Sequence, residues 1–392
     1  MTDTGLASSR RLRIAVLNRT FSPTGGGAER YSIALVEALS QQREFHIFAQ
    51  HIDHDWPAVT YHKVFAPFAR PRWINQLWFA VATWWATRRG FDVVHSHENT
   101  WHGQVQTVHV VPVKYSLFHG ISGWGKALRW LKVITSPRLL AYLALEYFRY
   151  RTSNHRVVMV TSNSLKSVMA IAYPQTATVV VPPGVARIPG RASADVQRVA
   201  RLELGLPLAG RCVLFVGNDY RKKGLPALVA AMRDLPTDCY LAVVGNSAQI
   251  SGFRAAYSHS GTVDRIHFLG SLNDVDVAYR AADCLAHPTL EDTFAMVVLE
   301  AMAHGLPVVV SSSRFCGISE QLQHGENAII LDDPKDVQAL VGGLSRLLGD
   351  AALCQKLEDG GIRFARCHLW SEIARRQEAF YEVVVSVQGA SI

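Results

Sequence analysis

The chain has 392 residues, of which 49% are hydrophobic and 18% charged, so it is long and apolar enough for two globular domains and is unlike a disordered chain. Its net charge of +8 is uneven, because residues 1–190 carry +12 and residues 191–392 carry −4. The basic first half indicates an anionic partner for that half. The six cysteines lie in the second half without a CxxC pair, which excludes a CxxC zinc site and favours a reducing compartment.

The N-terminal residues lack the pattern of a signal peptide, because 13 mainly polar residues precede an apolar run of only strand length, Ile14–Leu17. No apolar stretch reaches the roughly 18 to 20 residues of a membrane span. The longest candidate, residues 73–86, is interrupted by Asn75, Gln76 and Thr83. We therefore expect a cytoplasmic protein without a spanning helix.

The first half opens with a strand, a glycine loop and a helix. Residues 13–19 are predicted to form a buried strand, Gly25–Gly27 a loop, and residues 29–40 a helix. This order is typical of a parallel α/β domain of the dinucleotide-binding type, although a flexible turn is an alternative for the loop. Further strands are predicted at 44–50, 91–95, 105–111, 157–161 and 178–181.

Histidines lie at or near the ends of two of these predicted strands. His95, His97 and Glu98 are residue types that bind metal ions, but a third ligand is not evident. A loop that lines a cleft is the alternative interpretation. His109 lies on the predicted strand 105–111. It is interpreted as a hydrogen-bonded structural residue, and its position keeps a catalytic role open.

Two segments rich in Trp, Lys and Arg interrupt the α/β pattern, at residues 70–89 and 114–156. The second contains one acid, Glu146. Basic aromatic amphipathic helices are typical of membrane-surface binding, and a helical pair packed on its own domain is the alternative. Nucleic-acid binding is disfavoured, because no recognition motif accompanies the charge.

The second half repeats the α/β pattern after a Pro-, Gly- and Ser-rich linker at residues 187–193. We expect domains at 1–188 and 189–392, with about 371–392 forming a helix that packs back on the first domain. Predicted strands are 213–217, 240–245, 266–269 and 284–287, and predicted helices are 225–232 and 275–281.

Residues 288–310 combine an acidic loop, a helical pattern and a β-branched strand. The loop carries Glu291 and Asp292, and Glu300 lies about two turns into the helix. A helix N-terminus presents free N–H groups and a partial positive charge, which suit an anion. A phosphate at the helix start with a carboxylate behind it predicts a nucleotide site.

Four motifs, in order along the chain, resemble those of family 4 glycosyltransferases. They are a GGAER loop at Gly26–Arg30, a TxH strand ending at His109, a basic loop at Arg221–Gly224, and an acid-x7-Glu helix motif from Asp292 to Glu300 followed by GLPVV. The resemblance implies a GT-B fold, in which two Rossmann-like α/β domains with parallel sheets face a cleft and a C-terminal helix crosses back. It implies retaining, metal-independent sugar transfer with no cofactor.

The resemblance also implies roles for individual residues. Glu300 would hold the donor ribose, Asp292 would hydrogen-bond sugar hydroxyls, and His109 would lie near the reacting sugar. The cations that would neutralise the leaving diphosphate are Arg221, Lys222 and Lys223. The other residues implied in donor binding are Gly26, Gly27, Gly217, Glu291, Thr293, Phe294, Ala295, Met296 and Val297.

Three positions depart from the family pattern: Asp292 replaces Glu, Asn218 replaces Arg, and Pro183 replaces Asn. Whether Glu291 or Asp292 contacts the sugar is left open. Arg221 or Lys222 must supply the charge missing at Asn218, unless that charge is absent.

Residues 315–317 and the basic aromatic segments resemble the corresponding parts of lipopolysaccharide-core transferases. We expect transfer of a hexose from a UDP-sugar to an anionic lipid-linked or lipopolysaccharide-type acceptor, with the protein peripheral at the inner face of the cytoplasmic membrane. A sugar-nucleotide epimerase of similar fold and a non-catalytic nucleotide-sugar-binding scaffold are the alternatives.

Overall fold

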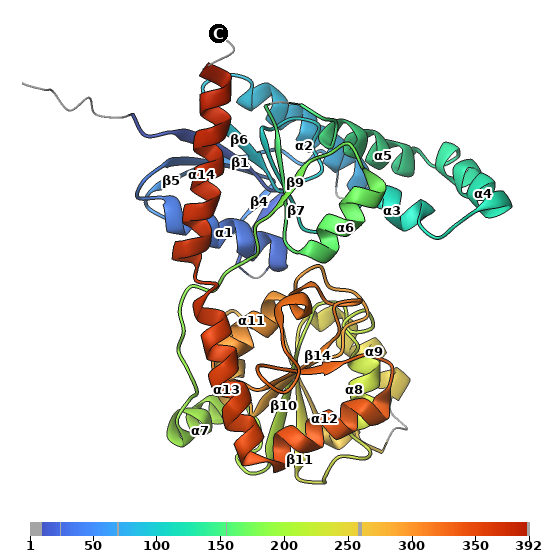
Figure 1. Ribbon diagram of the computed structural model, residues 1–392, viewed down its shortest axis with the longest axis vertical. Helices are drawn as coiled ribbons and strands as arrows, with labels where there is room; N and C mark the ends of the chain where they lie inside the picture. Colours follow the sequence, from blue (N-terminus) through green and yellow to red (C-terminus); the bar gives the residue numbers. More distant parts are fainter. Residues whose placement is uncertain (1–9, 24, 69, 154, 258–260, 390–392) are drawn as a thin grey trace, which may run out of the picture. The chain divides into compact units, whose positions relative to one another are not determined.

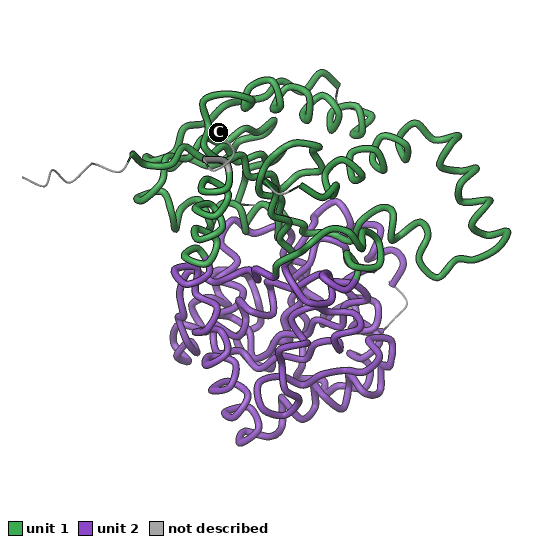
Figure 2. Tube along the Cα trace, turned by 45° about the horizontal axis from the view of Figure 1, so that its top comes forward, with its two compact units in different colours: residues 1–160, 168–179, 374–392 green, residues 161–167, 180–373 purple. Residues whose placement is uncertain are grey.

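The computed structural model describes residues 10–23, 25–68, 70–153, 155–257 and 261–389. The chain divides into two compact units (Figure 2). Unit 1 comprises residues up to 160, residues 168–179 and those from 374 onward, and unit 2 comprises residues 161–167 and 180–373. The boundary predicted between residues 188 and 189 stays a prediction, and the contacts divide the chain slightly earlier.

Unit 1 is built on a seven-stranded sheet of order β5-β3-β1-β6-β7-β8-β9, with parallel pairs from β5 to β8 (Figure 1). The chain runs outward from β1 in one direction and from β6 in the other, so the switch point lies between these two strands. The strands are β1 (Arg13–Leu17), β3 (Glu44–Ala49), β5 (Val59–Lys63), β6 (Val93–Ser96), β7 (Val105–Val108), β8 (Val157–Val160) and β9 (Thr178–Val180), with a separate short pair, β2 (Thr20–Phe21) and β4 (His51–Ile52).

The helices of unit 1 include the predicted glycine-loop helix and the two basic aromatic segments. The second of these segments forms three helices between residues 113 and 149. The helices are α1 (Gly27–Leu39), α2 (Arg72–Thr87), α3 (Val113–Phe118), α4 (Gly123–Ile134), α5 (Pro137–Arg149), most of α6 (Asn163–Ala172) and α14 (Trp370–Gly389) from residue 374.

The last helix belongs mainly to unit 1 through specific contacts. The Tyr381 hydroxyl lies 2.7 Å from Nδ1 of His95 on β6. Arg43 Nε donates to Glu378 Oε1 at 2.9 Å. A buried polar contact and an ion pair therefore fix residues 374–389 to this unit.

Unit 2 is built on a six-stranded parallel sheet of order β12-β11-β10-β13-β14-β15. Its switch point lies between β10 and β13. The strands are β10 (Arg211–Val216), β11 (Cys239–Val244), β12 (Ile266–Gly270), β13 (Cys284–His287), β14 (Val308–Ser311) and β15 (Ile329–Leu331). The helices are α7 (Ala194–Glu203), α8 (Leu225–Ala231), α9 (Ile250–Tyr257), α10 (Asp276–Ala281), α11 (Met296–Ala303), α12 (Val337–Gly349) and α13 (Ala351–Arg366).

The core of unit 2 lies on both faces of this sheet. On β10, Leu214 and Val216 pack into one buried cluster, while Val213 and Phe215 pack into the other. Successive strand residues point to opposite faces, so a fully apolar strand needs cover on both sides. The predicted parallel sheet with helices on both faces is confirmed for this unit (Figure 1).

Among the described residues, no single helix is both long and apolar enough to cross a membrane. Only α12 and α13 together reach that length and composition, and they are bent by 97° at their junction.

Two loops pack tightly at the switch point of unit 2. Gly224, between β10 and α8, has φ +83, and a Cβ there would lie 1.8 Å from the carbonyl oxygen of Pro288. A side chain at residue 224 is therefore excluded by conformation and by the backbone of the neighbouring loop. The loop after β10 and the loop after β13 are thus held against each other.

We predict that Gly224→Ala lowers the free energy of unfolding by about 2–4 kcal/mol, because the strained φ and the backbone clash add. The matched control is Gly205→Ala, since Gly205 has φ +64 and nothing within 4 Å of its added Cβ. The control is expected to cost about 1 kcal/mol. Urea denaturation measures both, and equal losses would contradict the close packing of the two loops.

Candidate functional site

The candidate site of unit 2 is formed by the loops that follow β10 and β13, on either side of the switch point. The first loop, 217–224, carries Arg221, Lys222 and Lys223, and the second, 288–295, carries the two adjacent acids. Ligands of open parallel sheets bind at the carboxyl ends of strands beside such a switch point. The fold therefore brings the predicted donor-site residues of this unit together.

Asp292 lies at the centre of these loops. Its Oδ2 accepts from Lys223 Nζ at 2.7 Å and lies 3.1 Å from Nε2 of His287. Its Oδ1 accepts from the backbone N–H groups of Ala295 at 2.9 Å and Phe294 at 3.3 Å. One carboxylate thus joins the basic loop, the end of β13 and the approach to α11.

These partners decide the ionisation of Asp292. Burial by itself raises the pKa of this carboxyl, but the hydrogen bond from His287 and the charge of Lys223 outweigh it and hold the pKa well below its ordinary value. Asp292 is therefore ionised at all ordinary pH values. Its charge is matched by Lys223, whose side chain packs beside Gly217, where an added Cβ would lie 3.0 Å from Lys223 Cγ.

The second ion pair between the loops is more exposed. Lys222 Nζ donates to Glu291 Oε1 at 2.7 Å, and the two side chains are 44% and 52% exposed. Arg221 is an exposed cation on the same loop. The basic loop thus presents one partly buried cation, Lys223, and two exposed ones.

The start of α11 follows directly. Ala295 precedes the helix with φ +72, a left-handed conformation that costs a residue with a Cβ about 1 kcal/mol. This turn directs the chain from Phe294, which is buried, into Met296 and Val297. The N–H groups of a helix's first turn have no intrahelical acceptor, so they are available to an anion. The backbone of Thr293 is enclosed by Gly317, as a Cβ on that glycine would lie 2.1 Å from the Thr293 carbonyl oxygen.

Glu300 is oriented by a residue that the sequence did not indicate. The Tyr279 hydroxyl, on α10, donates to Glu300 Oε2 at 2.7 Å. His304 stacks on the Tyr279 ring at 5.0 Å, and its Nε2 lies 3.6 Å from Asp276. Tyr279 is 1% exposed. It holds one oxygen of Glu300 in place, and only the fold could have identified it, because no motif links α10 to α11.

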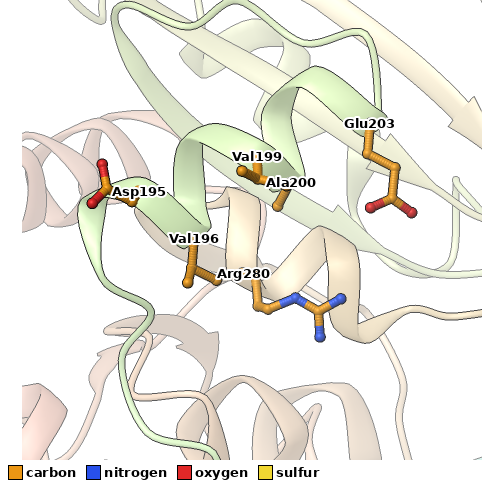
Figure 3. Close-up of a pocket in the computed structure, with 6 residues that line it drawn as sticks. All are labelled: Asp195, Val196, Val199, Ala200, Glu203 and Arg280. Atoms are coloured by element: carbon orange, nitrogen blue, oxygen red, sulfur yellow. The ribbon is translucent and has the colours of Figure 1, made fainter.

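A pocket of about 250 Å³ lies between α7 and α10 in the same unit (Figure 3). Its lining consists of Asp195, Val196, Val199, Ala200, Glu203 and Arg280. It shares no residue with the loops described above, and its wall is mainly apolar. Its one cation, Arg280, is accompanied by two acids, Asp195 and Glu203, so the lining does not favour a nucleotide diphosphate.

The candidate residues of unit 1 also lie beside a switch point. Gly26 is the N-cap of α1 and Gly27 its first residue. His109 follows the end of β7, and the ring of Tyr31 on α1 lies 5.1 Å from it, edge to face. The glycine loop and His109 are thus linked through α1.

A chain of histidines connects His109 to the sheet. Nδ1 of His97 lies 2.9 Å from Nε2 of His109, and the rings of His95 and His97 are 4.2 Å apart. Burial, reinforced by the charges of His109 and Arg149, lowers the pKa of His95 to about 3. Burial, reinforced by Arg149, also lowers the pKa of His109 to about 3. These imidazoles are therefore neutral hydrogen-bonding groups at neutral pH.

The metal interpretation of this cluster gains no support. Among the described residues, no group of three or more His, Cys, Asp or Glu side chains could hold a metal ion. His95 Nε2 instead lies 2.7 Å from Thr107 Oγ1, within the sheet.

The basic aromatic segments of unit 1 are partly structural. Arg149, in the second of these segments, is 4% exposed and donates to Gln106 Oε1 and to the Thr107 carbonyl. The single acid, Glu146, accepts from the backbone N–H groups of Val113 and Lys114 and so caps α3. Exposed apolar side chains of these segments lie on α4, which extends from the rest of unit 1 (Figure 1).

The two halves of the chain match two protein families. Residues 25–187 match the family described as Glycosyltransferase Family 4, and residues 197–364 match Glycosyl transferases group 1. The chain is 29% identical to D-inositol 3-phosphate glycosyltransferase of Corynebacterium glutamicum over 198 residues, which are 48% of this chain and 47% of the relative. It is 27% identical to the lipopolysaccharide glucosyltransferase WaaG of Escherichia coli over 182 residues, which are 44% and 47%. These matches span about half the length of the curated relatives.

Solved structures resemble the chain over nearly its whole length. A crystal structure of WaaG, a glycosyltransferase involved in lipopolysaccharide biosynthesis, has a TM-score of 0.80 at 19% identity and covers 95% of this chain and 99% of that one. HepE of Anabaena, in complex with UDP and glucose, has a TM-score of 0.74 at 16% identity, with coverages of 95% and 100%.

The chain has the GT-B fold, as shown by its two parallel sheets and by its structural similarity to WaaG. The chain belongs to the family 4 and group 1 glycosyltransferases, because the two family matches together account for most of its length. The fold class expected from the motifs is confirmed.

We predict that unit 1 loses stability as the pH falls from about 6.5 toward 3. An unfolded histidine takes up a proton near pH 6.5, whereas His95 does so only near pH 3 in the folded state, so protonation favours unfolding by up to about 1.4 kcal/mol per pH unit. Tryptophan fluorescence during urea denaturation measures this, because every tryptophan except Trp370 lies in unit 1. His95→Gln should reduce the slope, and the exposed control His155→Gln should not. A slope unchanged in His95→Gln would contradict the account.

Proposed function

We propose that the protein is a retaining, metal-independent glycosyltransferase that moves a hexose from a UDP-sugar to a membrane-presented acceptor in cell-envelope glycan synthesis, such as that of the lipopolysaccharide core. One observation carries the proposal. In unit 2, a loop with three cations, a helix N-terminus and an oriented carboxylate converge beside one switch point.

This arrangement fits the charge that develops during transfer. The bond between the anomeric carbon and the diphosphate oxygen breaks, and its electron pair stays on the diphosphate. The acceptor oxygen bonds to the anomeric carbon and loses its proton to the diphosphate or to solvent. Cations of the basic loop, such as Lys222, and the N–H groups at the start of α11 stabilise the departing charge, by a few kcal/mol per group.

Glu300 suits the donor's ribose. Tyr279 occupies Oε2 of Glu300, so the carboxylate is held in one orientation, and a carboxylate accepts hydrogen bonds from vicinal hydroxyls. The UDP complex of HepE supports a UDP-sugar as donor, and the lipopolysaccharide role of WaaG supports an envelope acceptor.

We propose that unit 1 receives the acceptor and that His109 contacts the reacting sugar. The low pKa of His109 makes its imidazole neutral, so it can donate or accept a hydrogen bond without adding a charge near the transferred sugar. Nε2 of His109 lies 2.9 Å from Nδ1 of His97, and the tautomers of the two rings decide which nitrogen donates.

The function is tested by incubating the protein with radiolabelled UDP-glucose, UDP-galactose, UDP-N-acetylglucosamine and GDP-mannose, with and without membrane lipid extract. We expect sugar release or transfer from at least one donor. Glu300→Ala is expected to weaken binding of the matching nucleoside diphosphate about 10- to 100-fold, because a charged hydrogen bond is lost, and Tyr279→Phe about 5-fold.

The matched control is Tyr240→Phe, which removes a hydroxyl bonded to the Pro207 carbonyl at 2.9 Å, far from any acid of the site. It should leave binding unchanged. Turnover of no donor would contradict the proposed activity. Conversion of a nucleotide sugar to its epimer would favour the epimerase.

We propose that α4 docks on an anionic membrane. Trp124, Leu128 and Leu131 are 87%, 65% and 58% exposed and recur at helical spacing, so they form one apolar face. Lys126, Arg129 and Lys132 lie on the same helix, and the sequence has no acid from residue 114 to 145. An exposed apolar face with flanking cations matches the chemistry of an interfacial helix.

We predict that the protein sediments with vesicles containing anionic phosphatidylglycerol and that salt weakens this binding. The combined variant Trp124→Ser, Leu128→Ser and Leu131→Ser should bind at least 10-fold more weakly, because the apolar contribution is removed.

A matched control replaces two exposed apolar residues of α7, Val199→Ser and Leu202→Ser, which are 62% and 60% exposed. This control should bind vesicles like the unaltered protein. Equal binding by both variants, or no binding at low salt, would rule out α4 as the docking surface.

A further inference from the structure

Glu291 and Asp292 are adjacent in the chain but differ in what they can still bind. The family resemblance assigns contact with the transferred sugar to the position of Asp292. The contacts of unit 2 support a different assignment.

Asp292 has no remaining capacity for a ligand. An ionised carboxylate offers about four lone-pair directions. In Asp292 they are taken by Lys223 Nζ, His287 Nε2, and the N–H groups of Phe294 and Ala295. A sugar hydroxyl could bind Asp292 only by displacing one of these partners from a side chain that is 16% exposed.

Glu291 has the capacity that Asp292 lacks. Its side chain is 52% exposed, and its Oε1 accepts one hydrogen bond, from Lys222. Within the described part of the chain, its Oε2 accepts none. The Glu291 backbone is nevertheless anchored, because its N–H donates to Thr289 Oγ1 at 3.3 Å and its carbonyl accepts from Lys223 Nζ at 3.2 Å. A half-exposed carboxylate therefore extends from an anchored backbone position in the loop.

The pair between Lys222 and Glu291 can open at low cost. Both side chains are about half exposed, and exposed ion pairs contribute little to stability. A diphosphate carries more charge than one carboxylate and is the stronger partner for Lys222. The pair of Lys223 and Asp292 is less exposed, at 22% and 16%, and breaking it would leave a poorly solvated charge without its partner.

We propose that Glu291, and not Asp292, hydrogen-bonds the hydroxyls of the transferred sugar, and that it is released for this role when the donor's diphosphate takes over Lys222. Asp292 is then a positioning residue that holds the loop and Lys223. This inference rests on the proposed function. It means that the sugar is recognised only after the diphosphate is bound, since until then Lys222 holds Glu291.

The test compares Glu291→Ala, Glu291→Gln and Asp292→Asn. Wild-type protein first identifies the donor from the panel of four nucleotide sugars by donor hydrolysis. Then kcat/KM for that donor, the dissociation constant of its nucleoside diphosphate and the melting temperature are measured for each variant.

We expect Glu291→Ala to lower kcat/KM at least 30-fold and Glu291→Gln to recover part of that loss. Nucleoside diphosphate binding by Glu291→Ala should stay equal or become up to 5-fold tighter, because the carboxylate no longer competes for Lys222. Its melting temperature should not change. Asp292→Asn should lower the melting temperature by several degrees and, where folded, keep the ratio of donor to nucleoside diphosphate affinity.

A kcat/KM of Glu291→Ala within 3-fold of wild type would overturn the inference. So would an Asp292→Asn variant of wild-type stability that binds nucleoside diphosphate normally but no longer discriminates the donor. If wild-type protein hydrolyses no donor and binds neither UDP nor GDP, the proposed function fails instead, and the two failures are thereby distinguished.

Discussion

Four hydrogen bonds meet on the buried carboxylate of Asp292, and the geometry of unit 2's site depends on them. They connect the loop after β10, the end of β13 and the turn before α11. Gly224 permits this arrangement, because its missing side chain lets the two loops touch. With the loops fixed, the backbones of the basic loop and of the turn before α11 are held in place before an anion binds.

Two of the cations in this site are already paired with acids before a ligand binds. Lys223 is neutralised by Asp292 in a partly buried pair, and Lys222 by Glu291 in an exposed one. A ligand can exchange partners with the exposed pair at little cost, whereas the partly buried pair is part of the framework. The same loop thus contains a rigid cation and an exchangeable one, which provides a physical basis for separate diphosphate and sugar recognition.

The elements with strong local signals were predictable from sequence. Strand residues 284–287 and the helix containing Glu300 were found because apolar periodicity and flanking Gly or Pro residues mark them. The position of the glycine loop and of the basic loop, each between a strand and the helix that follows it, was predicted from the α/β alternation. The end of β7 was set three residues too late, because the β-branched residues Val110 and Val111 continue beyond the last paired residue, Val108.

Features that depend on distant contacts were not predictable. The hydrogen bond from Tyr279 to Glu300 joins two residues that are 21 positions apart in the chain and lie on different helices. The burial of Arg149 depends on Gln106 and Thr107, which are more than 40 residues away. The left-handed conformation of Ala295 was also hidden, since alanine does not mark positive φ as glycine does. In each case the local sequence is ordinary and the tertiary environment determines the outcome.

We propose that the two loops and α11 form a donor site in which Glu291 moves from Lys222 to the hydroxyls of the transferred sugar. A crystal structure with a bound UDP-sugar tests it most directly. The account predicts diphosphate oxygens on Lys222 and on the first N–H groups of α11, ribose on Glu300, and Glu291 turned from Lys222 to the sugar, with the four bonds of Asp292 intact. A bound donor that leaves the pair of Lys222 and Glu291 closed, with Asp292 on the sugar, would contradict it.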